Sequence, residues 1–105
     1  MAYRIDDVFS ALADQNRRRI LMMLSEKQLT VNAISEKFKI SRPAISKHLK
    51  VLLNTKLVVP NQKGRERYYR LNVEPLNEVR KWMEFYDKFW DNKLKQLKNF
   101  VEGNL

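Results

Sequence analysis

Cysteine is absent from this 105-residue chain, and histidine occurs only once, as His48. Without thiolates the chain can hold neither a disulfide framework nor a cysteine metal site, and one imidazole cannot build a transition-metal site. Glycine occurs only twice, which excludes a glycine-rich loop that cradles phosphate. No nucleophile stands in a recognisable pattern with a base. We therefore predict a protein that is not an enzyme and that binds neither a metal ion nor a cofactor.

Long apolar runs are missing as well. No run approaches the roughly 20 residues of a membrane-spanning helix. The start Met1-Ala2-Tyr3-Arg4, followed at once by Asp6 and Asp7, does not have the pattern of a signal peptide. These absences predict a cytoplasmic protein without a membrane partner. Hydrophobic residues make up 44% of the chain, which is enough for one modest core, so we expect residues 1–105 to form a single domain.

Acidic residues are almost absent from the middle third of the chain. Residues 37–73 contain ten basic side chains and a single acid, Glu66. The flanking segments 1–36 and 74–105 are each neutral, so the whole formal charge of +9 lies in this middle segment. An even spread of charge would indicate only a solvated surface. Segregated positive charge favours a polyanionic partner instead.

Residues 42–53 are predicted to form an amphipathic helix inside this basic segment. Ser41 is a suitable N-cap, and Pro43 is tolerated in the first helical turn. One face is apolar, with Ile45, Leu49 and Leu52 at helical spacing. The opposite face carries small polar and basic side chains and no acid. A helix of this kind can pack on its own domain and also enter the major groove of DNA.

A shorter helix is predicted just before it, from Val31 to Lys37, with Thr30 as its N-cap. The short turn between the two helices gives the spacing of a helix-turn-helix, although a plain helical hairpin has the same spacing. Two further helices are expected upstream, over residues 3–13 and 15–26, with Asp14 capping the second. 

Three arginines, Arg17 to Arg19, fall in the first turn of the 15–26 helix, where the helix dipole disfavours cations. We favour a solvated surface on which one arginine pairs with Asp14 or Asp6. The alternative is a contact with a DNA phosphate or another neighbouring carboxylate.

Residues 57–71 are predicted to form a β-hairpin. Leu57-Val58-Val59 is a β-favouring run that Pro60 closes, and residues 67–71 alternate in polarity. The loop from Asn61 to Glu66 contains Gly64, which suits a turn with positive φ. A basic hairpin directly after a recognition helix is the wing of a winged helix, and an ordinary solvated hairpin is the alternative. The basic residues at its tip are Lys63, Arg65 and Arg67.

Pro75 opens the longest predicted helix, which runs to about Glu102 with Gly103 as its stop. Its apolar residues recur at spacings of three and four, and a second apolar row widens the face. Such a face is too broad for one intramolecular contact, so we expect a two-fold dimer through the first and last helices; the alternative is a purely intramolecular core. The predicted dimer contacts are Ile5, Val8, Phe9, Trp82, Met83, Tyr86, Phe89, Trp90, Leu94 and Leu97.

Three blocks of the sequence resemble the ArsR/SmtB family of winged-helix repressors. They are Phe9-x-Ala11-Leu12-Ala13-Asp14-x-x-Arg17-Arg18-x-Ile20-Leu21, Ser41-Arg42-Pro43-Ala44-Ile45-Ser46-Lys47-His48-Leu49-Lys50-Val51-Leu52, and Gly64-Arg65-x-x-x-Tyr69-x-Leu71. The middle block is the most specific, and the resemblance spans about residues 5–100. It implies a mostly helical winged helix-turn-helix in the order α-α-α-α-β-β-α. By position, the resemblance implies a recognition helix from Arg42 to Leu53, a wing from Asn61 to Arg67, and dimer contacts from the first and last helices. It further implies a dimeric transcriptional repressor that binds a double-stranded DNA operator, with the repressor's own operon as one candidate target.

The chain departs from this family at the positions that bind metals. Arsenic- and cadmium-type members carry a Cys-x-Cys pair at the start of the third helix, where Thr30 and Asn32 stand here. Zinc-type members use Asp and His pairs on the last helix, and this last helix has no histidine. Asp87 and Asp91 are one turn apart, but beside Lys88 they indicate a solvated face. The chain thus resembles the branch without the usual metal motif, and its effector is not identified by the sequence.

The predicted DNA contacts fall into two groups. Arg42 and Lys47 are candidates for guanine O6 and N7, Ser46 for a base or phosphate, and Pro43 and Ala44 for a thymine methyl group. The other basic residues are assigned to phosphates, which position the protein without specifying sequence. His48 is either a half-buried packing residue or a DNA contact. The full set is Lys39, Ser41, Arg42, Pro43, Ala44, Ser46, Lys47, His48, Lys50, Lys63, Arg65 and Arg67.

These observations predict a sequence-specific DNA-binding regulator. The main rival is a winged helix used as a protein–protein interaction module, such as an anti-activator, and the other is a nonspecific nucleic-acid-binding protein. Charge alone does not distinguish DNA from RNA duplexes. A steep loss of DNA affinity with salt would support the regulator, whereas no binding at low salt would support the protein–protein module.

Overall fold

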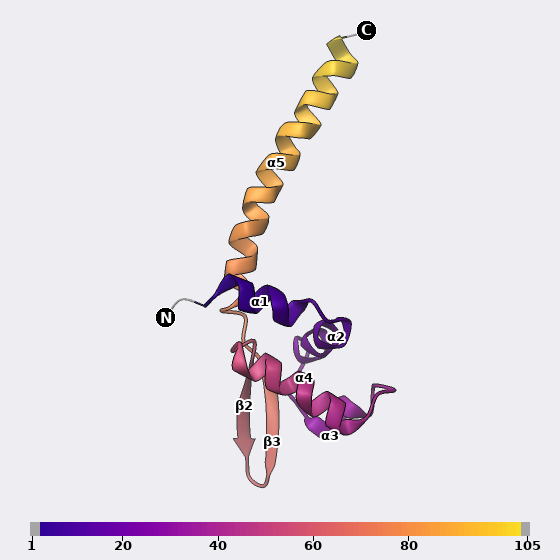
Figure 1. Ribbon diagram of the computed structural model, residues 1–105, viewed down its shortest axis with the longest axis vertical. Helices are drawn as coiled ribbons and strands as arrows, with labels where there is room; N and C mark the ends of the chain where they lie inside the picture. The colour runs from indigo at the N-terminus through magenta and orange to yellow at the C-terminus, as the bar shows by residue number, and fades with distance from the viewer. Residues whose placement is uncertain (1–2, 104–105) are drawn as a thin grey trace.

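The computed structural model describes residues 3–103. In chain order the elements are α1 (Ile5–Leu12), α2 (Gln15–Leu24), β1 (Leu29–Thr30), α3 (Val31–Ser35), α4 (Arg42–Asn54), β2 (Val58–Lys63), β3 (Glu66–Leu71) and α5 (Leu76–Gly103). Figure 1 shows α1 lying across the base of α5, which extends away from the other elements, while the hairpin of β2 and β3 points in the opposite direction. The predicted order of helices and hairpin strands is confirmed, and the short strand β1 is an addition that the sequence analysis missed.

Side chains at the N-cap positions start three of the helices. The Asp14 carboxylate accepts hydrogen bonds from the backbone N–H groups of Asn16 and Arg17, at 2.8 and 3.1 Å. The hydroxyl oxygens of Thr30 and Ser41 accept from the N–H groups three residues onward, at 3.2 and 3.3 Å. All three predicted caps are therefore confirmed, because each satisfies an N–H group that has no partner within its helix.

The sheet has the strand order β1-β3-β2, and both pairings are antiparallel. The predicted loop from Asn61 to Glu66 is wrong, because β2 continues through Pro60 to Lys63 and only Gly64 and Arg65 form the turn. Pro60 is tolerated because β2 lies at the edge of the sheet, where one side of the strand needs no N–H donors. Gly64 adopts a φ of 61°, as the tight turn requires.

A core of apolar side chains joins the four short helices to the sheet. Ile45, Leu49 and Leu52 are all buried, which confirms the predicted inner face of α4. Burial of one such side chain contributes roughly 1.5–3 kcal/mol, and this inward face holds the outer face of α4 toward solvent. The buried core residues are Val8, Ala11, Ile20, Leu21, Leu24, Ile34, Ile45, Leu49, Leu52, Leu57 and Val58.

The 28-residue helix α5 is anchored only at its beginning. Leu76 and Val79 pack against the core, and Trp82 contacts Phe9 of α1 edge to face, with ring centroids 5.9 Å apart. No residue of α5 is buried in the described protomer. The helix is described up to Gly103, within one residue of the predicted end near Glu102, and Gly103 has no positive φ.

Candidate nucleic-acid interface

The outer face of α4 is exposed and keeps its positive charge. Arg42, Lys47 and Lys50 are exposed, and none of them takes part in the ion pairs found within residues 3–103. The smaller residues predicted to contact DNA lie on the same side: Ser41, Pro43 and Ser46 are exposed, and Ala44 is half-buried. Lys39, in the turn before α4, is exposed as well. The free cations and small side chains together form a surface suited to a groove between phosphates.

The hairpin places its basic side chains beside the start of α4. Arg42, Arg65 and Arg67 line one cleft of about 390 Å³, together with Asn32 and Tyr69. The Arg67 guanidinium lies 5.4 Å from the centroid of the Tyr69 ring, so the ring supports it without neutralising its charge. The structure therefore brings the first turn of α4 and the hairpin of β2 and β3 together on one surface.

Glu66 is the one acid that lines this cleft. Its carboxylate accepts a hydrogen bond of 2.9 Å from the Tyr68 hydroxyl, and Lys63 Nζ lies 5.4 Å from the Tyr68 ring centroid. The hydrogen bond to Glu66, together with the negative charge of Glu66, raises the pKa of the Tyr68 hydroxyl. The hydrogen bond from Tyr68 therefore holds the Glu66 carboxylate on the hairpin, among the cations that are predicted to contact phosphate.

The three consecutive arginines of α2 bind carbonyl oxygens at the ends of other helices. Arg17 donates from Nε to Ala11 O at 2.7 Å and from Nη2 to Ser10 O at 3.1 Å, and Arg18 donates to Leu12 O at 2.8 Å. The Arg19 guanidinium donates to the Lys37 carbonyl oxygen at 2.7 Å, just beyond α3.

The favoured prediction for this run is confirmed in that Arg18 and Arg19 are exposed, whereas Arg17 is half-buried, and the predicted Arg–Asp ion pair is wrong. Within residues 3–103, no arginine of this run forms an ion pair with Asp6 or Asp14. The carbonyl groups in the last turn of α1 carry partial negative charge, although that of Ser10 also accepts a backbone hydrogen bond from the Ala13 N–H at 3.2 Å. Arg17 and Arg18 therefore stabilise the end of α1. The dipole of α2 disfavours these cations, but the carbonyl end of α1, which the sequence does not place beside them, accepts Arg17 and Arg18.

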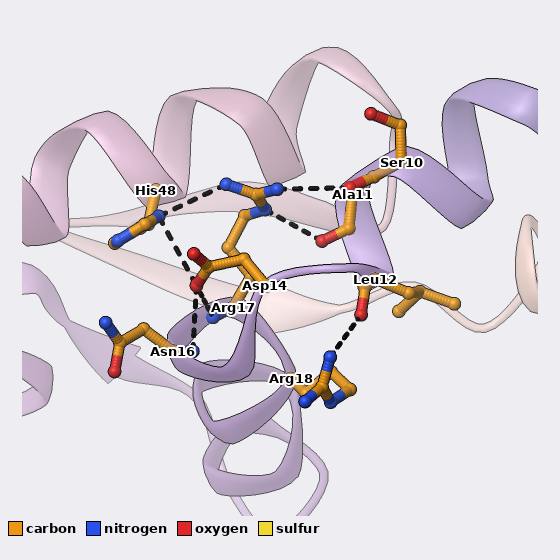
Figure 2. Close-up of polar contacts among 8 residues, drawn as sticks. All are labelled: Ser10, Ala11, Leu12, Asp14, Asn16, Arg17, Arg18 and His48. Carbon is orange, nitrogen blue, oxygen red and sulfur yellow. Dashed lines mark hydrogen bonds and ion pairs between the residues drawn. The ribbon is translucent and has the colours of Figure 1, made fainter.

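His48 joins α4 to this arginine cluster. Its Nδ1 lies 3.3 Å from Arg17 Nη1 and 3.9 Å from Asp14 Oδ1, and its side chain is only 19% exposed. Figure 2 shows Arg17 lying between the His48 ring and the carbonyl oxygens of Ser10 and Ala11. The half-buried alternative for His48 is thus confirmed, and a DNA contact by its other ring nitrogen stays a prediction.

The charge of the Asp14 carboxylate contributes to the stability of the fold, and this contribution depends on pH. The hydrogen bond from the Arg17 backbone N–H lowers the pKa of Asp14 below 3.8, partial desolvation opposes this, and nearby His48 favours the carboxylate again. Because the pKa is lower in the folded chain, the charged carboxylate stabilises the fold above the unfolded pKa, and this contribution is lost as the pH falls through the folded pKa.

Replacing Asp14 with alanine is expected to cost about 1 kcal/mol of stability at neutral pH, because the N-cap of α2 is lost. Asp14→Asn retains the cap and removes only the charge, so its smaller deficit should shrink between neutral pH and a pH below 3.8. Urea unfolding of both variants and the unmodified chain at the two pH values measures this. A deficit of Asp14→Asn that does not change with pH would contradict the assignment.

A second surface is apolar and runs along α1 and α5. Trp82 stacks on Tyr86 with ring centroids 5.7 Å apart, and Tyr86 contacts Trp90 edge to face at 5.9 Å. Farther along, Leu94 and Leu97 are 56% and 59% exposed. Of the other predicted dimer contacts, Phe9, Met83 and Phe89 are exposed and Ile5 is half-buried.

Val8 does not belong to this apolar surface. Its side chain is 1% exposed and lies in the protomer core, so its assignment to the dimer contacts is wrong. Phe85 and Phe100 were left out of the predicted contacts, yet they are among the most exposed apolar residues of α5. The heptad-like spacing indicated the width of the face, but only the tertiary contacts show which residues of α1 remain available.

Comparison with known proteins identifies the family. Residues 14–58 match the model for the bacterial regulatory proteins of the arsR family. The chain is 37% identical over 90 residues to the transcriptional repressor SdpR of Bacillus subtilis (strain 168), covering 86% of this chain and 100% of SdpR. It is also 37% identical over 75 residues to the arsenical resistance operon repressor of Bacillus subtilis (strain 168), covering 70% of this chain and 71% of that protein.

A solved structure agrees with the sequence relatives. The ArsR-like transcriptional regulator from Rhodococcus sp. RHA1 superimposes with a TM-score of 0.76 at 32% identity, covering 94% of this chain and 91% of that one. Among the helices described here, none is long and apolar enough to cross a membrane. Because relatives named as transcriptional regulators align with nearly the whole chain and its helix-turn-helix, the chain belongs to the ArsR family of DNA-binding transcriptional regulators and is not an enzyme.

Proposed function

We propose that the chain is a homodimeric repressor that binds a two-fold-symmetric operator in double-stranded DNA. The observation that carries this proposal is the exposed face of α4, where Arg42, Lys47 and Lys50 form no ion pair with the described residues. In a two-fold dimer the two α4 helices read half-sites roughly 34–36 Å apart, which is one turn of DNA. The operator of its own gene, in the cytoplasm, is the first candidate target.

The dimer proposal rests on the apolar surface of α1 and α5. The aromatic row that begins at Phe9 and Trp82 continues along α5 to side chains with no intramolecular cover in the described chain, such as Leu94. Monomers seldom leave so large a connected apolar surface in water. A second copy covers it most simply, because a two-fold interface brings the same surface of both subunits together.

Within the DNA interface we assign different roles to the helix and the wing. Arg42 and Lys47, with Ser46 between them on the outer face, are proposed to contact base edges in the major groove. The wing cations Lys63 and Arg65, beside the cleft, contact phosphates. This division follows from position, since α4 presents the convex outer face and the hairpin stands next to its first turn.

DNase footprinting of the purified chain on the DNA upstream of its own gene tests the proposal. We expect a protected two-fold-symmetric site, binding that weakens steeply with salt, and a dimeric mass in solution. Absence of DNA binding at low salt would overturn the proposal that the chain regulates its own gene by binding this operator. A monomeric mass at the concentrations that give protection would overturn the dimer.

Glu66→Gln is expected to increase affinity for any duplex about threefold to fivefold at low salt. The substitution removes the only acid of the basic segment, and one charge contact near the surface is worth about 1 kcal/mol when solvent screens it. Glutamine retains an oxygen that can accept from the Tyr68 hydroxyl. Fluorescence anisotropy over a salt series should show a gain that disappears at high salt, and a loss of affinity at low salt would contradict it.

A further inference from the structure

We infer that Arg17 positions His48 as a donor to DNA by holding it in the tautomer that carries its proton on Nε2. This inference rests on the proposed binding of operator DNA. It assigns Arg17 a positioning role, although its own side chain faces the protein. The ligand atom that receives the hydrogen bond is a phosphate oxygen at the edge of the major groove.

The tautomer follows from which atoms can donate. A guanidinium group has donors only, so the contact of 3.3 Å between Arg17 Nη1 and His48 Nδ1 requires Nδ1 to accept. A neutral imidazole that accepts at Nδ1 carries its hydrogen on Nε2. The competing tautomer would donate from Nδ1 to Asp14, but Asp14 Oδ1 lies 3.9 Å away, beyond hydrogen-bond distance, and already accepts two backbone N–H groups.

Nε2 is left facing solvent. No hydrogen bond to Nε2 is formed by the described residues, and no buried side-chain nitrogen or oxygen in this part of the chain lacks a partner, so Nε2 is accessible to water. Figure 2 shows this nitrogen on the side of the ring away from Arg17. His48 follows the exposed Lys47 on α4, and because successive residues of a helix lie about 100° apart around its axis, the His48 ring lies beside the basic face of α4.

The last turn of α1 holds the Arg17 guanidinium in place through two hydrogen bonds. Its Nε and Nη2 donate to the carbonyl oxygens of Ala11 and Ser10, which belong to the last turn of α1. This leaves Nη1 directed at His48. Because α1 also contacts α5 through Phe9 and Trp82, the orientation of the His48 ring is tied to the helices of the proposed dimer surface.

The first test uses side chains that place an amide nitrogen at one ring position or the other. Glutamine reaches the place of Nε2, whereas asparagine reaches only that of Nδ1. We expect His48→Gln to bind operator DNA within about threefold of the unmodified chain, and His48→Asn and His48→Ala to bind about tenfold more weakly. Because the acceptor is a phosphate, the loss should be the same on random DNA. Equal binding by His48→Gln and His48→Asn would overturn the role of Nε2.

The second test separates positioning from helix capping with a matched pair. Arg17→Gln and Arg18→Gln each remove a guanidinium that caps α1, but only Arg17 contacts His48. We expect Arg17→Gln to weaken DNA binding about fivefold to tenfold and Arg18→Gln to leave it within twofold, with partial rescue in Arg17→Lys. Equal losses for the two glutamine variants would show that capping, not positioning, is responsible.

The third test reads the tautomer without DNA. Because His48 is the only histidine, long-range ¹H–¹⁵N spectra of the untagged chain report a single imidazole. At a pH where the ring is neutral, we expect the hydrogen on Nε2 in the unmodified chain and a mixture of tautomers in Arg17→Gln. A hydrogen on Nδ1 in the unmodified chain would overturn the inference even if the operator is bound. Failure to bind any DNA would overturn the proposed function while leaving the tautomer result intact.

Discussion

A Leu94→Asp chain is expected to be monomeric and to lose specific operator binding. Leu94 is 56% exposed and lies outside the protomer core, so the substitution should leave the fold of each subunit intact. In a two-fold interface the change acts twice: each subunit loses roughly 1.5–3 kcal/mol of apolar burial and places an unpaired carboxylate in the contact. The dissociation constant of the dimer should therefore rise about a thousandfold or more.

The same charge on the other side of α5 provides the control. Asn99 lies about half a turn away from Leu97 around the helix axis, so Asn99→Asp adds one carboxylate outside the proposed seam. Sedimentation velocity gives the mass of each variant, circular dichroism gives its helix content, and fluorescence anisotropy gives its operator affinity. A Leu94→Asp chain that remains dimeric and binds the operator normally would contradict an interface on this face.

Arg42→Ala is expected to reduce discrimination between operator and random DNA, whereas Lys63→Ala and Arg65→Ala should weaken binding to both equally. A lost bidentate contact to guanine costs about 1–3 kcal/mol of discrimination, which is roughly fivefold to 150-fold. A lost phosphate contact instead reduces the slope of log affinity against log salt by about one. The comparison is informative because Arg42 and Arg65 line the same cleft but have different proposed roles.

Lys88→Ala provides the matched control, since it removes one positive charge from α5, outside the basic segment. Anisotropy titrations of each variant on operator and random duplexes, repeated over a salt series, give the specificity ratio and the salt slope. Equal loss on both duplexes for Arg42→Ala would show that Arg42 contacts phosphate. An altered specificity ratio for Arg65→Ala would show that the wing reads sequence.

Much of the DNA-binding unit could be predicted from the sequence, because local rules govern it. The caps at Asp14, Thr30 and Ser41 depend on side chains two or three residues from the groups that they satisfy. The buried face of α4 follows from helical periodicity alone. Features with longer reach were missed: β1 is too short to show alternation, and Pro60 is acceptable only because β2 lies at the edge of the sheet.

The sequence by itself therefore determined the position of the recognition helix and the segregation of positive charge around it, since spacing and composition are properties of neighbouring residues. Only the tertiary structure decided which partners distant groups find. In the folded chain Val8 is buried in the core and not on the predicted dimer surface. Arg17 and Arg18 bind carbonyl oxygens at the end of α1, and Arg17 contacts His48, 31 residues away in the chain. The physical reason is that a charged side chain pairs with whatever unsatisfied group the folded backbone brings within about 3 Å, and no sequence period encodes that distance.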